Sequence, residues 1–401
     1  MKTADFDFQF PENLIAYHPL ERGESRMMVV DRVIAAAPQG GDAGSGGRTA
    51  LWSHTRNLID FLASGDALVL NDTKVLRARL IGENEAGARV EALLLAPAYP
   101  DAYPDAHLDA HPDAHSRHPA GGSAPGPIGR SDAPGAASGR TRWEAMVKPG
   151  KRFRVGDRAI FSSRLIATVA AVADDGTRVL EFGLTPHAFH EELEVTGKIP
   201  LPPYIRREAS EADSGSYQSV FAAHPGSVAA PTASLHLSEA MLEAIRAKGV
   251  EIRKVTLHVG AGTFKPVQSE DLSGHVMHSE RYVMTEETAD SLNAVKAKKG
   301  RIWAVGTTAA RVLETRARGT GSAIFTPGAG ETDIFIHPGY AWKGVDGLLT
   351  NFHWPKSTLF MLVCSLLGPE RAKAAYAEAF AQGFRLFSYG DAMLIRSTEK
   401  P

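Results

Sequence analysis

Four apolar runs of the chain each end in side chains that could bind a ligand or move a proton. The clusters are Asn71-Asp72-Thr73, His258 with the glycine-rich segment 260–264, Gly306-Thr307-Thr308, and Asn351-Phe352-His353. The carboxyl ends of parallel strands meet at one edge of an open α/β sheet, and ligands bind there. The sequence therefore predicts one composite site built from several strand ends.

The segment HVGAGTF places Gly260 and Gly262 between His258 and Phe264. It is not a phosphate loop, because no Gly-Lys-Ser/Thr follows, and it lacks the third glycine of a dinucleotide fingerprint. Glycines would let a flat ring lie against the backbone, with Phe264 stacked on it and Thr263 alongside. A β-bulge or tight turn explains the glycines equally well, so both interpretations stay open.

His236 and His258 are the candidates for proton transfer. An imidazole titrates near neutral pH and can act as an acid or a base. Each histidine taken alone is more often structural. Thr307 and Thr308 open a predicted helix whose free amides could meet a carboxylate or phosphate, with Arg311 one turn further on. A simple threonine N-cap is the alternative there.

Composition excludes several classes of protein. The 401 residues include 44 Lys and Arg, 46 Asp and Glu, and one cysteine, Cys364. A near-neutral chain must hold any polyanion through a local basic patch. One cysteine rules out an internal disulfide, and no H-E-x-x-H or Ser-His-Asp order is present, so neither a metal site nor a hydrolase is expected. No apolar run reaches the ~20 residues of a membrane span, and no signal peptide is recognisable, so a cytoplasmic protein is expected.

The elements that position these side chains fall into two groups. Short alternating runs broken by Gly, Pro and Asp fill residues 74–183 and predict a small β-barrel or sandwich. Within it, residues from about 97 to 141 carry a Pro/Leu-Asp-Ala-His/Tyr repeat and are predicted to be disordered. After residue 183, helices alternate with strands, which is typical of an α/β sheet that the first seventy residues are expected to join.

Two basic stretches, VKPGKRFRVGDR and GKIPLPPYIRRE, could hold RNA. Cations bind phosphates, and an aromatic ring stacks on a splayed base. A solvated basic surface explains either stretch equally simply. The RNA-binding candidates are Lys148, Lys151, Arg152, Lys198, Tyr204 and Arg206.

Many motifs in fixed order resemble those of the S-adenosylmethionine:tRNA ribosyltransferase-isomerases of queuosine biosynthesis. They include GKIPLPPYI, YQSVFA, GSVAAPTASLHL, VTLHVGAGTFKPV, AVGTTAARVLE, TDIFIHPG and TNFHWPKSTLFMLV. The resemblance runs from about Phe6 to Ile395. It implies a large α/β domain with a mixed sheet flanked by helices, assembled from residues 1–73 and 184–401, and an inserted small β-barrel domain at 74–183.

The resemblance also implies a reaction. Such enzymes transfer and isomerise the ribosyl moiety of S-adenosylmethionine onto 7-aminomethyl-7-deazaguanine (preQ1) at the tRNA wobble position. The products are epoxyqueuosine in tRNA, adenine and methionine. The expected partners are S-adenosylmethionine, a consumed co-substrate, and tRNA with a GUN anticodon. A monomer without metal, cofactor or membrane partner is expected.

Each candidate residue receives a hypothetical role from this reaction. His236 and His258 would transfer protons, with a base tuned near neutral pH. The nucleoside pocket would be lined by Gly260, Gly262, Thr263 and Phe264. Thr307, Thr308 and Arg311 would receive the methionine carboxylate. Asn71, Asp72, Asn351 and His353 would orient the ribose or the modified base.

The chain departs from the family pattern at three positions. Ser234 and Leu237 stand where a glycine and an aromatic residue are usual, and Trp354 stands where an aliphatic residue is usual.

Two other functions, from different functional classes, are alternatives. One is a tRNA methyltransferase, which lacks support because no glycine-rich first loop with its paired acid is present. The other is an inactive RNA-binding module, against which the intact His236 and His258 argue.

Overall fold

The computed structural model describes residues 1–32, 50–98, 139–150, 153–260, 267, 269–318 and 323–397. The chain forms two compact units, which are treated separately below. The large unit combines Met1–Lys74 with Leu201–Pro401, and the small unit is Val75–Pro200. Across the described ranges, no helix combines the length and apolar character needed to cross a membrane.

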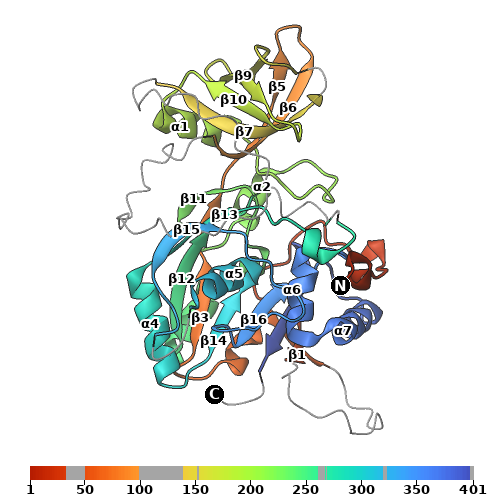
Figure 1. Ribbon diagram of the computed structural model, residues 1–401, viewed down its shortest axis with the longest axis vertical. Coiled ribbons are helices and arrows are strands. Elements are labelled where there is room, and N and C mark those ends of the chain that lie inside the picture. Colours follow the sequence, from red (N-terminus) through yellow and green to blue (C-terminus); the bar gives the residue numbers. More distant parts are fainter. Residues whose placement is uncertain are drawn as a thin grey trace. The chain divides into compact units, whose positions relative to one another are not determined.

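The small unit is a closed six-stranded barrel with strand order β10-β7-β6-β5-β8-β9 (Figure 1). Its elements are β5 (Arg79–Asn84), β6 (Arg89–Pro97), β7 (Thr141–Lys148), β8 (Arg158–Ile160), β9 (Ile166–Val172), β10 (Arg178–Phe182) and helix α1 (Pro186–Thr196). The strand pattern alternates, as in β7, so one side of each strand faces the barrel core. The expected small barrel is confirmed.

The small unit ends later than residue 183, where the sequence analysis places its boundary. Helix α1 belongs to the barrel because Phe189 and Leu193 are part of its buried core. The Phe189 ring lies 5.6 Å from that of Trp143, which explains why the unit extends to Pro200. The predicted disordered insertion from about 97 to 141 lies mostly outside the described residues.

A nine-stranded mixed sheet organises the large unit (Figure 1). In spatial order its strands are β15 (Gly328–Thr332), β13 (Glu280–Met284), β12 (Glu251–Leu257), β3 (Ala67–Asn71), β14 (Ile302–Val305), β16 (Gly347–Asn351), β17 (Ala392–Arg396), β1 (Arg26–Asp31) and β2 (Leu51–His54). The four strands β12, β3, β14 and β16 are mutually parallel, so their carboxyl ends share one edge. The expected mixed α/β fold is confirmed.

Helices cover both faces of this sheet. They are α3 (Glu239–Ala247), α4 (Glu286–Ala297), α5 (Gly306–Arg316), α6 (Thr358–Leu367) and α7 (Pro369–Ala381). Alternate residues of a strand point to opposite faces. Thus Val69 packs in the core formed with α4 to α7, whereas Leu68 and Leu70 pack with α3 and the 3₁₀ helix Thr55–Phe61.

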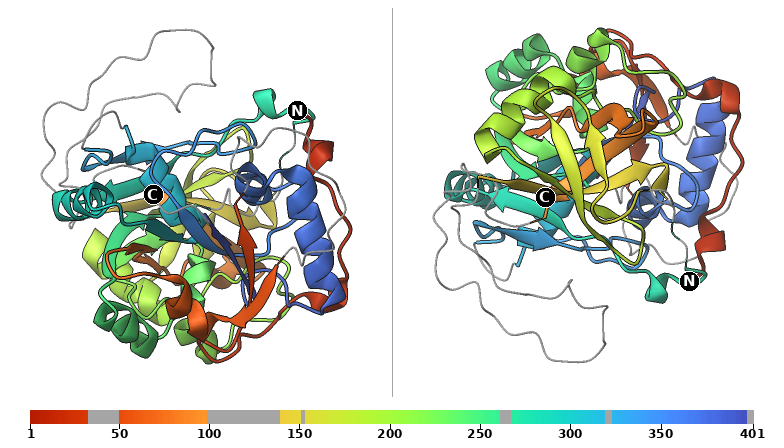
Figure 2. Two further views of the ribbon diagram at one scale, coloured as in Figure 1. Left: turned by 90° about the horizontal axis from the view of Figure 1, so that it is seen from below. Right: turned by 90° about the horizontal axis from the view of Figure 1, so that it is seen from above.

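The remaining short elements join these layers. They are the two-stranded pair β4 (Thr73–Val75) and β11 (His224–Ser227), helix α2 (Glu211–Ser216), and the 3₁₀ helices Thr3–Phe6, Glu12–Leu14, Thr232–His236 and Leu272–Gly274. The amino-terminal segment runs beside α6 and α7 (Figure 2). The Phe8 ring contacts Phe360 of α6 at 4.8 Å and Tyr376 of α7 at 5.3 Å.

Local sequence signals explain where the helices begin. The hydroxyl of Ser238 accepts a hydrogen bond from the Met241 amide at 3.2 Å, and Ser357 caps α6 through the Phe360 amide at the same distance. A side-chain oxygen at the N-cap satisfies an amide that has no partner within the helix. Helix α5 is different, because its N-cap residue is Val305, which provides no such oxygen.

Helix α5 is instead fixed through the buried carboxylate of Glu314. One oxygen accepts hydrogen bonds from the amides of Gly344 and Val345, both at 3.0 Å. The other accepts from the Lys343 amide at 2.9 Å and from the Tyr340 hydroxyl at 3.1 Å. Hydrogen bonds to an ionised acceptor are among the stronger ones in proteins. They anchor α5 to the segment that enters β16.

Candidate functional site

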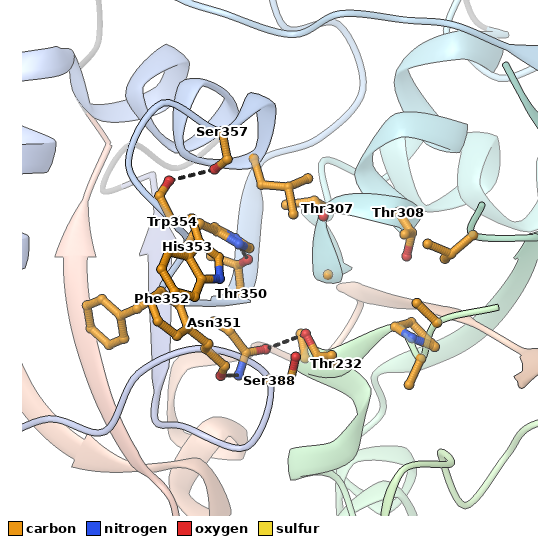
Figure 3. Close-up of a pocket in the computed structure, with 18 of the residues that line it drawn as sticks. Thr232, Thr307, Thr308, Thr350, Asn351, Phe352, His353, Trp354, Ser357 and Ser388 are labelled. Atoms are coloured by element: carbon orange, nitrogen blue, oxygen red, sulfur yellow. Dashed lines mark hydrogen bonds between the residues drawn. The ribbon is translucent and has the colours of Figure 1, made fainter. Parts of the chain in front are cut away.

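A cavity of about 330 Å³ lies at the carboxyl edge of the parallel strands, within the large unit. Figure 3 shows Thr307 and Thr308, at the start of α5, on the side of the cavity opposite Asn351, His353 and Trp354. The structure thus brings two of the four predicted strand-end clusters to one cavity. Its other lining residues include Tyr204, Tyr217, Thr232, Thr350, Phe352, Ser357, Phe387 and Ser388.

Asn351 connects three walls of the cavity. Its side-chain oxygen accepts a hydrogen bond from the Thr232 hydroxyl at 3.1 Å. Its side-chain nitrogen donates to the Phe387 carbonyl oxygen at 3.1 Å and contacts His236 Nε2 at 3.2 Å. With the amide in this orientation, Nε2 is the acceptor and the neutral His236 ring carries its proton on Nδ1. His236 therefore positions Asn351 and is not itself a lining residue of the cavity.

Burial keeps the nearby imidazoles neutral. Desolvation, with smaller contributions from Arg22 and Arg385, lowers the pKa of His236 to about 4. Burial alone lowers the pKa of His353 to about 3. The His353 ring accepts or donates a hydrogen bond through Nε2 with the Thr350 hydroxyl at 2.7 Å, and it lines the cavity. Both rings are therefore neutral at pH 7, and of these two only His236 was expected to supply a base tuned near neutral pH.

The lowered pKa of His236 predicts a pH-dependent stability. Below pH 6.5 the unfolded chain binds a proton at this ring, while the folded protein does so only near pH 4, so stability falls as the pH is lowered between these values. From pH 7 to pH 5 this single group accounts for on the order of 2 kcal/mol. Urea unfolding at both pH values should show a smaller pH dependence in His236→Gln than in the wild type.

Substitution of the exposed His187 serves as the control for this measurement, since its side chain is 84% accessible. Its replacement by glutamine should leave the difference between pH 7 and pH 5 unchanged. An identical pH dependence in wild type and His236→Gln would show that the His236 ring does not carry the effect.

The start of α5 presents free backbone amides to the cavity. Gly306 has a φ of +86°, a conformation that favours glycine, and it turns the chain from β14 directly into the helix. The N-cap residue Val305 provides no capping oxygen, and Thr307 and Thr308 line the cavity. Uncapped amides at a helix N-terminus, with the helix dipole, favour an anionic group. The helix that the sequence predicted to open at these threonines is present, and its role in binding a carboxylate stays a prediction.

Hydrogen bonds from the Asn71 side chain stabilise this helix start. Its side-chain nitrogen donates to the Leu257 carbonyl at 3.0 Å and to the Thr308 hydroxyl at 3.1 Å. Its side-chain oxygen accepts from the amides of Leu257 at 3.0 Å and Thr73 at 3.2 Å. An asparagine has two donor and two acceptor positions, so all four are used within the protein. Asn71 ties β3, β12 and α5 together and does not line the cavity.

Asp72 and His258 do not line the cavity. Asp72 accepts a hydrogen bond from the Thr256 hydroxyl at 2.7 Å and lies 3.6 Å from His224 Nε2, and burial raises its pKa. His258 Nδ1 is 2.9 Å from the Thr73 hydroxyl. Burial, followed by Arg281 and His224, lowers the pKa of His258 to about 4.

The His258 ring packs directly on Gly226, at the end of a short strand pair. A β-carbon at Gly226 would lie 2.7 Å from two ring atoms of His258, and the glycine has a φ of +150°. No other residue fits this position without moving the ring. His258 is thus held firmly in place. The predicted site residues Gly262, Thr263 and Phe264 lie outside the described residues.

Arg311 does not line the cavity. Its guanidinium forms a buried ion pair with the carboxylate of Glu280, and both side chains are nearly inaccessible. The second carboxylate oxygen of Glu280 accepts a hydrogen bond from the Gly260 amide at 3.0 Å. Arg311 therefore fixes the start of the glycine-rich segment to β13 and α5. This pairing has no signal in the sequence, because Glu280 and Arg311 are 31 residues apart.

The RNA-binding candidates have different surroundings. Lys148 ends β7 of the small unit and Arg206 belongs to the large unit, and both are exposed. Lys198 pairs through its backbone with Arg79. Tyr204 lines the cavity and donates from its hydroxyl to Ser388 Oγ at 2.6 Å. Lys151 and Arg152 are outside the described residues.

The sequence analysis missed the aromatic wall of the cavity. The rings of Trp354 and Phe387 are stacked, with centroids 4.0 Å apart and planes 10° apart. Phe387 has a φ of +69°, which is a rare and strained conformation for a bulky residue. The motif NFHWPKSTL contained Trp354, but nothing in the sequence linked it to Phe387. In the part of the chain that the structure describes, no group of three or more His, Cys, Asp or Glu side chains could hold a metal ion.

Comparisons with known proteins match nearly the whole chain. A family model described as queuosine biosynthesis protein matches residues 3–395. The S-adenosylmethionine:tRNA ribosyltransferase-isomerase of Symbiobacterium thermophilum is 43% identical over 398 residues, covering 98% of this chain and 100% of that protein. The enzyme of the same name from Xanthobacter autotrophicus is 42% identical, covering 98% of each. A crystal structure of S-adenosylmethionine tRNA ribosyltransferase from Thermotoga maritima is 29% identical, covers 98% of this chain and 99% of its own, and has a TM-score of 0.48.

Proposed function

The chain belongs to the family of queuosine biosynthesis proteins, as an S-adenosylmethionine:tRNA ribosyltransferase-isomerase, and from this we propose the reaction and its site. The ribosyl moiety of S-adenosylmethionine is transferred to the aminomethyl group of 7-aminomethyl-7-deazaguanine (preQ1) at the wobble position of tRNA. Isomerisation then gives epoxyqueuosine, and adenine and methionine are released.

The observation that carries this proposal is the division of the cavity into a polar and an aromatic side. The uncapped start of α5, with Thr307 and Thr308, suits the methionine carboxylate. The opposite side, with Tyr204, Trp354 and Phe387, suits flat heterocyclic rings. The cavity volume of about 330 Å³ is within the range of small-molecule sites.

The proposed chemistry begins at the sulfonium. Its positive charge acidifies the neighbouring C5′ proton, so a base can remove it, and the resulting ylide expels adenine. The amine of the modified base then attacks, the epoxide closes and methionine leaves. His353 lines the cavity as a neutral imidazole, which supports a direct role for it in proton transfer. His236 acts through Asn351, and His258 acts beside the glycine-rich segment.

The polynucleotide substrate is proposed to be a tRNA with a GUN anticodon. Its contacts would come from Lys148, Lys151, Arg152, Lys198, Tyr204 and Arg206. S-adenosylmethionine is consumed as a co-substrate, and no other cofactor enters the proposal. We place the reaction in the cytoplasm and assign it to a monomer.

Mass spectrometry tests the proposal most directly. Purified protein is incubated with S-adenosylmethionine and an anticodon stem-loop that carries the aminomethyl-deazaguanine base. Free adenine, free methionine and an RNA mass gain that matches an epoxycyclopentanediol group are expected. A methyl-sized gain with S-adenosylhomocysteine would instead identify a methyltransferase, and binding of RNA without any product would identify an inactive module.

A further inference from the structure

Trp354 is held as one half of a rigid aromatic stack. Phe387 covers one face of its indole, and Phe10 meets the stack edge-on, with its ring 5.3 Å from Trp354 at 87°. Tyr204 contacts the same ring at 5.5 Å. Phe387 is buried, but Trp354 remains 37% exposed. The indole therefore keeps open surface at the cavity while its partners restrict its movement.

The strained backbone of Phe387 is stabilised by its neighbours. Its carbonyl accepts the hydrogen bond from Asn351, and the amide of Ser388 donates to the Tyr204 hydroxyl at 2.9 Å. A bulky residue with positive φ is strained and persists only where the surroundings enforce it. The same residues that shape the cavity thus also hold the stack in place before any ligand arrives.

An indole that is backed by a second ring and stays partly exposed in a cavity lining can serve as a stacking surface for a flat heterocycle. The proposed reaction involves two such rings, the adenine of S-adenosylmethionine and the modified base of the RNA. The exposed position of Trp354 favours the RNA base, because a base that swings out of an anticodon loop arrives from solvent. Arg206, two residues after Tyr204, is exposed and forms no hydrogen bond or ion pair within the described ranges, so it is available to a neighbouring phosphate.

We propose that Trp354 is the platform on which the aminomethyl-deazaguanine base of the RNA stacks during the reaction. This inference rests on the proposed function, since it assigns one of its two substrates to one wall of the cavity. Trp354 is thereby a substrate-positioning residue for the RNA. The S-adenosylmethionine molecule keeps its contacts at the start of α5.

Substitution of Trp354 separates the two substrates kinetically. Trp354→Leu should raise the KM for the modified stem-loop by ~10-fold or more, in line with the stacking of one base on an aromatic ring. The KM for S-adenosylmethionine should change little. Trp354→Phe should recover most of the RNA affinity, because it restores a ring. Trp52→Leu, which replaces another exposed tryptophan at 38% accessibility, should change neither constant.

A fluorescence titration gives a readout that does not need turnover. The modified stem-loop should quench tryptophan emission in the wild type and much less in Trp354→Phe, whereas S-adenosylmethionine alone should quench both proteins equally. Quenching of Trp354 by S-adenosylmethionine instead of RNA would assign the platform to adenine and overturn the inference. Unchanged constants in Trp354→Leu would do the same. If the RNA quenched the tryptophan emission of the wild-type protein but no ribosyl transfer occurred, only the proposed function would be contradicted.

Discussion

Asn351→Asp is expected to reduce the rate of adenine release at saturating substrates by about 100-fold, the cost of moving reacting groups by roughly 1 Å. An oxygen would replace the nitrogen that now lies 3.1 Å from the Phe387 carbonyl oxygen and 3.2 Å from His236 Nε2. At the carbonyl, two acceptors would then face each other with no proton between them. The loop that carries the aromatic stack should shift away from β16.

Thr232→Val is the matched control for this variant. It removes only the hydrogen bond to the Asn351 oxygen and keeps both contacts of the Asn351 nitrogen. Its loss of turnover should be much smaller than that of Asn351→Asp. Thermal unfolding of both variants checks that they remain folded. If Asn351→Asp turned over at nearly the wild-type rate, the three walls of the cavity would not depend on this amide.

Glu280→Gln is expected to lower the free energy of unfolding by about 3–5 kcal/mol, because it leaves a buried guanidinium without its counter-charge. The NH2 group of glutamine would also face a donor in either orientation, the Arg311 guanidinium or the Gly260 amide. The loss should appear as a lower urea midpoint at pH 7. The substitution should also affect the position of Gly260, because the Gly260 amide donates a hydrogen bond to Glu280 at 3.0 Å.

The surface pair of Glu24 and Arg56 provides the comparison. Both side chains are about half exposed, at 49% and 48%. Exposed ion pairs contribute little to stability, so Glu24→Gln should have little effect. The double variant Glu280→Leu with Arg311→Met should recover part of the stability lost in Glu280→Gln, because no unpaired charge remains. A Glu280→Gln protein as stable as Glu24→Gln would contradict the importance of the buried pair.

Much of the architecture could be predicted from the sequence because it depends on local patterns. Alternation predicted the barrel, helix-strand repetition predicted the α/β sheet, and Ser238 marked the start of α3. The rule that parallel strands share an edge anticipated that Thr307 and Thr308 would face Asn351 and His353 across one cavity. These inferences need only periodicity and strand direction.

Tertiary contacts account for what could not be predicted. Arg311 follows the two threonines by one helical turn, but its partner Glu280 lies on another strand, so the sequence could not show that its charge is already used. The aromatic wall is assembled from Phe10, Tyr204, Trp354 and Phe387, which are spread across the whole chain. The left-handed backbone of Phe387 has no sequence signature either, since nothing about phenylalanine favours it.

The order of strands in the large unit determines when its sheet can form while the protein is synthesised on the ribosome. Strand β3 lies inside the sheet between β12 and β14, which begin at Glu251 and Ile302. A nascent chain that has reached Pro200 therefore holds every strand of the barrel, while β3 still lacks both neighbours. Contacts so distant in sequence form slowly and leave apolar strands exposed meanwhile. Strand β17 (Ala392–Arg396) must be synthesised before β1 and β16 can each pair with it.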